Sequence, residues 1–254
     1  MNLTNALAES CDTFFYKTSL EVGIDKIAEM ARRLGLGDQL GFDIYGERPG
    51  LIPDKAWKRK RYGEKWHAGE TVVASIGQGA TLTTPLQLAT MIARLVNGGR
   101  AVKPWINGYI DNVPQFNDKW ASVGLDPYHL KLIKGGMDRV VLGENGTARG
   151  SRIRTKGMEM SGKTGTAQVR RITKAQRKEG VKQADVDWQD RHHALFVGYA
   201  PARKPKYACS VVVEHGGSGS GAAAPVARDI LLEVQKRDPA SKLFKPNGGL
   251  KGDV

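Results

Sequence analysis

Apolar side chains recur at helical spacing in four stretches of the first 145 residues. Residues 3–20 carry such a pattern, but Ser10-Cys11-Asp12 interrupts it with residues that favour caps and turns. We therefore expect two helical pieces joined by a polar turn. A helix over 24–34 follows and is ended by glycines, and Thr84-Pro85 starts a helix that runs to Val96. Asp126-Pro127 starts a fourth, which ends near 143.

The pattern changes in the last hundred residues. The stretch 161–169 suits an extended strand, and the apolar runs 194–200 and 207–213 are separated by proline-rich turn residues, which predicts an antiparallel hairpin. Residues 216–221 are predicted to be a flexible link. An amphipathic helix is expected over 222–234, with Pro225 in its first turn.

Three stretches show neither the helical nor the strand pattern of apolar residues. Residues 41–68 are rich in glycine, proline and charge and interleave basic side chains with Trp57, Tyr62 and Trp66. Such a mixture could bind single-stranded nucleic acid, but a solvated loop with aromatic anchors is the interpretation we prefer. The segment 170–191 carries a net charge of +3 and is predicted to form a mobile surface hairpin or short helix. Residues 145–156 are predicted to be a polar loop.

Charge and composition restrict the possible functions but do not identify one. The chain has 254 residues, 40% of them hydrophobic, and a net charge of +13, which would attract nucleic acid, anionic lipid or another anionic polymer. No apolar run is long enough to span a bilayer, and the start does not resemble a signal peptide. Cys11 and Cys209 form no metal or disulfide pattern, and the five histidines lack ligand spacing, so we expect no metal and no cofactor. The five histidines are His67, His129, His192, His193 and His215.

The stretch 157–169 fits two incompatible chemistries. Gly157 to Thr164 satisfies the G-x-x-x-x-G-K-[ST] pattern of a phosphate-binding loop, whereas Lys163-Thr164-Gly165 is an element of penicillin-binding proteins and β-lactamases. A phosphate-binding loop needs an apolar strand before it and a helix beginning at its Lys-Thr. Neither flank has that character, although Glu214 after a valine run could imitate a magnesium-holding acid, so an NTPase remains the weaker alternative.

The wider pattern resembles the C-terminal transpeptidase part of class B penicillin-binding proteins. Ser10-Cys11-Asp12 matches the family's Ser-x-Asn/Asp element, and Ser161 to Ala167 matches its Lys-Thr-Gly strand. Further matches are Trp66 to Thr71, Ile76 to Gly79, Thr84 to Ala89, His193 to Pro201 and Ala223 to Ala227. Asp12 and the basic insertion after the strand resemble penicillin-binding protein 2, the elongation enzyme, more than the division enzyme.

The resemblance implies an α+β fold with an antiparallel sheet and flanking helices. It implies a partial transpeptidase domain over 1–237, with a helical part over about 1–145, the sheet and final helix over about 155–237, and a loosely ordered tail over 238–254. It also implies peptidoglycan stem peptides and β-lactams as ligands and other elongation proteins as partners, whereas nucleic acid is not expected. The implied location is the periplasmic side of the bacterial inner membrane.

Roles follow from the resemblance residue by residue. Ser10 would relay a proton toward the leaving group, Asp12 would hold a lysine partner or shape the site, and Lys163 would supply positive potential and help proton transfer. Thr164 and Thr166 would bind the substrate carboxylate, Gly165 would allow close approach, and the Thr166 amide would form half of an oxyanion hole. For Ser10 and Asp12 alone, a helix cap is the simpler alternative.

One departure from the family is large. Its nucleophile is the serine of a Ser-x-x-Lys element, and no Ser-x-x-Lys occurs in these 254 residues. We therefore expect a fragment without nucleophile, pedestal domain or membrane anchor, which is inactive alone. A non-catalytic penicillin-recognising sensor or scaffold is the other class to consider, and carboxypeptidase or β-lactamase activity would need the same residues.

Overall fold

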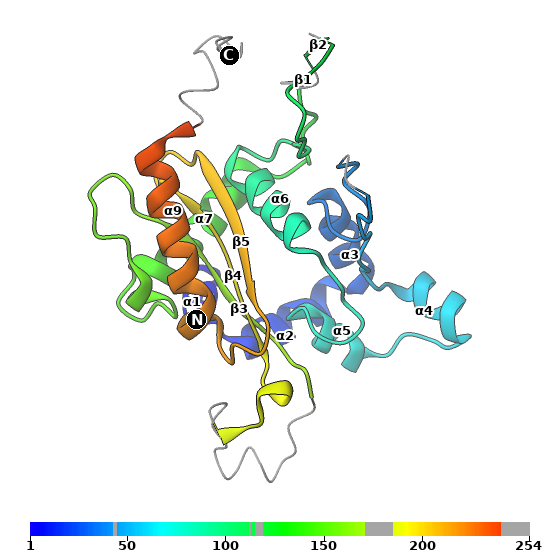
Figure 1. The fold of residues 1–254 in the computed structure, drawn as a ribbon. Coiled ribbons are helices and arrows are strands. Elements are labelled where there is room, and N and C mark those ends of the chain that lie inside the picture. Colours follow the sequence, from blue (N-terminus) through cyan, green and yellow to red (C-terminus); the bar gives the residue numbers. More distant parts are fainter. Residues whose placement is uncertain (43–44, 112, 115–118, 171–184, 240–254) are drawn as a thin grey trace.

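The computed structural model describes residues 1–42, 45–111, 113–114, 119–170 and 185–239 (Figure 1). Its first helices are α1 (Leu3–Ala8) and α2 (Asp12–Val22), and the turn between them contains Ser10 in a left-handed conformation, with φ of 55°. The two helical pieces and the polar turn are therefore confirmed. Gly23, with φ of 84°, separates α2 from α3 (Ile24–Arg33).

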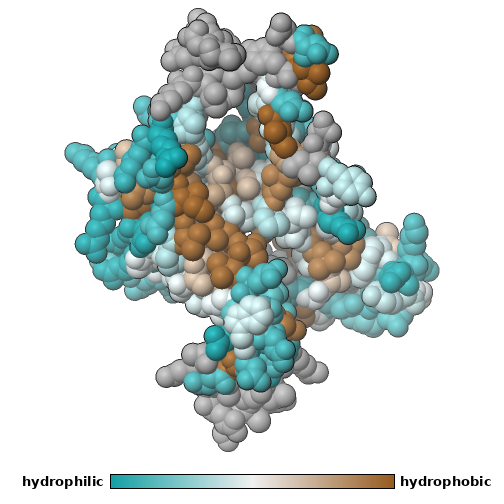
Figure 2. All heavy atoms as spheres, in the orientation of Figure 1, coloured by the Kyte–Doolittle hydropathy of each residue, from teal (hydrophilic) through white to brown (hydrophobic). Residues whose placement is uncertain are grey.

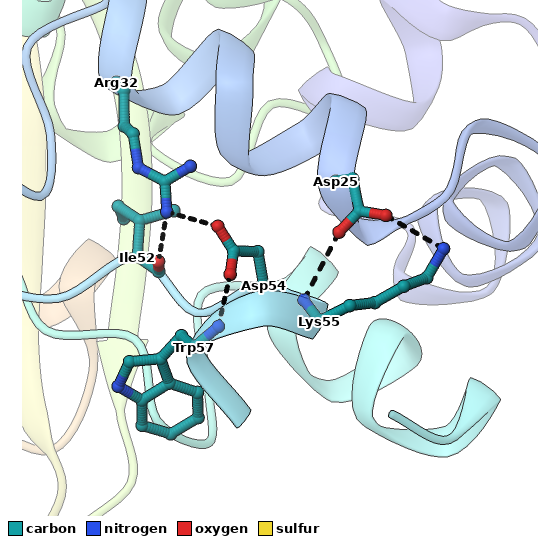
Figure 3. Close-up of polar contacts among 6 residues, drawn as sticks. All are labelled: Asp25, Arg32, Ile52, Asp54, Lys55 and Trp57. Carbon is teal, nitrogen blue, oxygen red and sulfur yellow. Dashed lines mark hydrogen bonds and ion pairs between the residues drawn. The ribbon is translucent and has the colours of Figure 1, made fainter. Parts of the chain in front are cut away.

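The stretch 41–68 was predicted to be a loop, and this prediction was wrong for its second half, where α4 (Lys55–Tyr62) lies. The Asp54 side chain caps α4 by accepting from the Trp57 amide, and Gly63 ends it in the left-handed region. Tertiary ion pairs add to the caps: Arg32 binds Asp54 at 2.7 Å and Lys55 binds Asp25 at 2.8 Å (Figure 3). These contacts stabilise a helix whose own apolar pattern is too weak to predict it.

Three further helices pack along the middle of the chain. α5 (Ala68–Ser75) begins with the Glu70 carboxylate accepting from the His67 amide at 2.8 Å, and α6 (Pro85–Val96) begins with a reciprocal cap between Thr84 and Gln87. α7 (Pro127–Leu142) is capped by Asp126, as predicted. Short elements complete this part: β1 (Tyr109–Ile110), β2 (Val113–Pro114), and the 3₁₀ turns η1 (Arg149–Ser151) and η3 (Trp188–Asp190).

The sheet consists of β3 (Ser161–Ala167), β4 (His193–Ala200) and β5 (Tyr207–Val213), antiparallel and in sequence order. On one face, Phe196 lies opposite Val211 and packs against α9 (Ala224–Arg237). On the other face, Tyr199 packs with Ile92 of α6 and Met137 of α7. Figure 1 shows the resulting layers, with α9 on one side of the sheet and α7 on the other. This is the expected α+β fold.

Residues 216–221 were predicted to be a flexible link, but the structure places a π-helical turn, η4 (Gly219–Ala223), over the sheet. Gly219 is buried, and a Cβ there would overlap the Leu195 carbonyl and the backbone of Gly165. The absence of a side chain is therefore what allows η4 to approach β3 and β4 closely. The glycines serve packing at this point, not flexibility.

Two expectations fall largely outside the described residues. These are the conformation of the basic insertion, at 171–184, and that of the tail, at 240–254. Within the described parts, no helix is both long enough and apolar enough to cross a bilayer. Apolar side chains gather along α9 and β5 on the face seen in Figure 2, and Val212, Val226 and Ile230 are among the exposed ones.

Candidate active site

β3 is an edge strand, and no described strand pairs with its open edge, the one that faces away from β4. The Thr166 carbonyl accepts a hydrogen bond from Gln78 Nε2 at 2.8 Å, and the Thr164 carbonyl accepts one from Lys163 Nζ at 3.0 Å. Both carbonyls therefore point away from β4. Because the N–H and C=O of one residue point to the same side of an antiparallel strand, the Thr166 amide also faces this edge. An extended peptide could pair with the backbone here.

Lys163 and Ser10 meet at this edge although they are 153 positions apart. Lys163 Nζ donates to Ser10 Oγ. The turn is held by the Cys11 amide, which donates to the Ala6 carbonyl at 2.9 Å and so closes the end of α1. A non-glycine residue in the left-handed region costs roughly 1 kcal/mol or more, so the fold maintains a strained backbone at Ser10.

The surroundings of Lys163 alter its acid–base chemistry. Burial lowers the pKa of its ammonium group from 10.5 to about 8, and the nearby charge of Asp12 opposes this shift. Asp12 is exposed at the first position of α2. Near neutral pH a measurable fraction of Lys163 is thus unprotonated, so this side chain is suited to both accepting and donating a proton.

The remaining predicted residues lie on the same strand. Thr164 Oγ1 is 3.0 Å from Thr147 Oγ1 and 3.5 Å from Lys163 Nζ, so it joins the polar cluster around the lysine. Thr166 is exposed, and within the described chain its hydroxyl has no hydrogen-bond partner. The structure therefore brings Ser10, Lys163 and Thr164 together, with Asp12 and Thr166 at the rim.

Asp138 of α7 supports the beginning of β3. The buried Ser161 hydroxyl donates to Asp138 Oδ1 at 2.5 Å, and the Tyr199 hydroxyl donates to the same oxygen at 3.1 Å. Burial, together with the charge of Asp138, raises the pKa of Tyr199. The three side chains fix the strand two residues before Lys163, which makes Asp138 a positioning residue.

Sequence reasoning missed three of these contributors. Gln78 belongs to the matched stretch Ile76 to Gly79, but nothing in that stretch indicated a contact with Thr166. Thr147 lies in a loop and Asp138 in a helix, and neither carries a motif. Their roles arise from tertiary contacts across 88, 17 and 23 positions, respectively.

The phosphate-binding loop is not supported by the structure. Such a loop requires a helix to begin at Lys163-Thr164, but both residues lie inside β3, paired with Val197 and Phe196. Across the described ranges, no group of three or more His, Cys, Asp or Glu side chains could hold a metal ion.

Comparison with known proteins decides the family. The profile described as penicillin binding protein transpeptidase domain matches residues 1–232. The chain belongs to this family. The peptidoglycan D,D-transpeptidase MrdA of Acinetobacter baumannii is 37% identical over 260 aligned positions, which cover 98% of this chain. The protein of the same name from Escherichia coli K12 is 32% identical over 97% of this chain.

Solved structures agree with the family match. The chain is similar to Pseudomonas aeruginosa PBP2 in complex with WCK 5153, with a TM-score of 0.78, 36% identity and coverage of 99% of this chain and 49% of that one. It is similar to Helicobacter pylori PBP2 in complex with MreC, with a TM-score of 0.79, 31% identity and coverage of 93% and 40%. The resemblance to a class B enzyme of the penicillin-binding protein 2 type is confirmed.

The match extends over only part of each relative. The chain spans 37% of the length of the Acinetobacter baumannii protein and 39% of the Escherichia coli one.

Proposed function

We propose that this chain forms the substrate-binding wall of a peptidoglycan D,D-transpeptidase. The observation that carries the proposal is the contact between Lys163 and Ser10 at the open edge of β3. It places a lysine of lowered pKa, a hydroxyl and outward-facing backbone groups within one short stretch of surface. Acyl transfer needs those three components: a proton carrier, a relay and an oxyanion donor.

In the proposed reaction, a serine hydroxyl attacks the carbonyl carbon of a D-alanyl-D-alanine stem peptide. The peptide bond breaks, the terminal D-alanine leaves with a proton, and an ester to the serine remains. The amine of a second stem then attacks the ester, forms the cross-link and returns the proton to the serine. Ser10 relays the proton in the first step, and Lys163 supplies the positive potential.

The other residues hold the donor peptide. The Thr164 and Thr166 hydroxyls bind its terminal carboxylate, and the Thr166 amide stabilises the oxyanion. Gly165 lets the peptide backbone approach the strand. Asp12 balances the charge beside Lys163 and shapes the entrance; in the acylating enzyme it would also hold the lysine of the Ser-x-x-Lys element.

The acylating serine cannot be assigned to this chain, because the 254 residues contain no Ser-x-x-Lys element. We therefore expect residues 1–254 alone to form no covalent adduct with a labelled penicillin. Intact-mass spectrometry after incubation is the measurement, and a stoichiometric adduct would refute this assignment.

A chimera tests the function itself. Residues 1–232 replace the matched region of the Acinetobacter baumannii relative, and the product is assayed for penicillin acylation and cross-linking of stem peptides. We expect both activities, and we expect Lys163→Ala and Ser10→Ala to reduce acylation about 10²-fold or more. A folded chimera that is not acylated would contradict the proposal.

If the transpeptidase function holds, β-lactams are its inhibitors, the periplasmic side of the inner membrane is its location, and partners such as the MreC seen with the Helicobacter pylori relative become candidates.

A further inference from the structure

A cavity of about 480 Å³ lies beside the candidate active site, between α4, α5 and the turn over 77–80. This volume is within the range of ligand sites, roughly 300–1,000 Å³. Gln78, Gly79 and Ala80 form one wall, and Gln78 also donates to the Thr166 carbonyl. Gln78 therefore joins the lining of the cavity to the edge of β3 that faces away from β4.

Aromatic side chains form much of the lining, and they are held in place. Trp57 and Tyr62 meet edge to face with ring centroids 5.6 Å apart. The Trp66 indole donates to Thr71 Oγ1 at 2.8 Å, which fixes the orientation of its ring. The caps and ion pairs of α4 at Asp54 and Lys55 secure the helix that carries Trp57 (Figure 3).

The charged groups of the lining have a net negative charge. Lys58 is almost completely buried and binds Glu70 at 2.6 Å and Glu64 at 3.5 Å, so one cation faces two carboxylates. In the described chain, only Oε2 of each carboxylate accepts a hydrogen bond or forms an ion pair. Glu64 and Glu70 therefore retain acceptor capacity for a second cation.

We propose that this cavity binds an aliphatic side chain that ends in an ammonium group, carried by a peptide lying along β3. The aliphatic part would contact Val73, Ala74 and the rings, and the ammonium would bind the free carboxylate oxygens and the aromatic faces. Arg59 and Arg61 of α4 are exposed to solvent. Salt therefore screens their repulsion of the ligand's ammonium group at distances beyond about 8 Å. The peptide as occupant rests on the proposed function.

Two probes that differ only in the terminal ammonium group test the cavity. Nα-acetyl-lysine amide has the ammonium, and Nα-acetyl-norleucine amide lacks it. Each is titrated into the chain while the indole N–H signals of Trp57 and Trp66, assigned with Trp57→Phe and Trp66→Phe, are followed by NMR. We expect saturable shifts with the lysine probe and at least about fivefold weaker binding of the norleucine probe.

Glu64→Gln is the decisive variant, because the Glu64 side chain is 66% exposed and Lys58 keeps its partner Glu70. We expect this variant to weaken binding of the lysine probe about fivefold and to leave binding of the norleucine probe unchanged. Glu233→Gln, on α9 far from α4 in Figure 1, is the matched control and should change neither. Equal affinity for the two probes, no binding of either, or no effect of Glu64→Gln would overturn the proposal.

The chimera separates this inference from the proposed function. If it cross-links, Glu64→Gln should raise the KM for a donor peptide that bears a side-chain ammonium about fivefold and leave kcat unchanged. An unchanged KM in an active chimera overturns the cavity's role. Selective binding of the lysine probe in a chain whose chimera is inactive supports the cavity and refutes the transpeptidase function.

Discussion

Lys163 is the catalytic candidate whose acid–base behaviour is altered by burial. Its pKa of about 8 means that the folded protein holds this proton less tightly than the unfolded chain, where the value is near 10.5. Below pH 8 the group is charged in both states, and the folded state bears the full cost of burying the charge. Between pH 8 and 10.5 the folded state loses the proton first, so this cost disappears as the pH rises.

The expected consequence is a pH-dependent difference between the native chain and Lys163→Met. From pH 8 to 10 the free energy of unfolding of the native chain should rise relative to that of the variant, by no more than about 1.4 kcal/mol per pH unit. Urea denaturation at several pH values measures this difference in the free energy of unfolding. Lys26→Met, at an exposed position of α3, should show no such trend. A difference that is constant across this range would contradict the buried-lysine account.

At the level of elements, the position of β3 depends on one glycine. A Cβ at Gly162 would overlap the Val197 carbonyl and the Phe196 ring, both in β4. A Cβ at Gly165 would come no closer than 3.3 Å to Leu195 Cβ. The two glycines of the same strand therefore differ: Gly162 allows β3 to pack on β4, whereas a Cβ at Gly165 would need only a small adjustment of Leu195.

Gly162→Ala should destabilise the chain by about 1–3 kcal/mol, because the core of the sheet cannot yield without moving Phe196. Gly165→Ala should cost less than about 1 kcal/mol, since only a small adjustment of Leu195 is needed. Urea denaturation of both variants gives the comparison. Similar losses in the two proteins would show that the contact at Gly162 does not control the strand.

The sequence predicts the elements that carry their own signals. Thr84-Pro85 and Asp126-Pro127 mark the starts of α6 and α7, and the valine run of β5 marks a strand. It does not predict α4, because that helix depends on Arg32 and Asp25 of α3 as well as on its own caps. Nor does it predict η4, where glycines that usually indicate flexibility allow close packing instead.

The candidate site was only partly predictable for the same reason. Ser10, Asp12 and Lys163 lie in motifs, so their importance could be inferred from residue type and order. The contacts of Gln78 with Thr166 and of Asp138 with Ser161 depend on the packing of α5 on α2 and of α7 against β3. No local pattern encodes that packing, which is why these residues became visible only in the structure.

At the level of the whole molecule, the dominant feature is the net charge of +13. Part of it is concentrated on α4, where Arg59, Lys60 and Arg61 are exposed beside the aromatic cavity. A surface of this kind attracts anionic polymers over distances set by the Debye length. For the proposed function, the relevant polymer is peptidoglycan, whose stem peptides bear carboxylates.

Binding to purified peptidoglycan should therefore weaken with salt, by about tenfold between 50 and 300 mM NaCl, because the attraction is mainly long-range and screened. Co-sedimentation measures it, and peptidoglycan with amidated carboxylates is the control that should bind weakly at both concentrations. A mixed-sequence oligonucleotide gives the comparison with nucleic acid. Salt-independent binding to peptidoglycan would contradict the electrostatic account, and tighter binding to the oligonucleotide at 150 mM NaCl would favour nucleic acid as the partner instead.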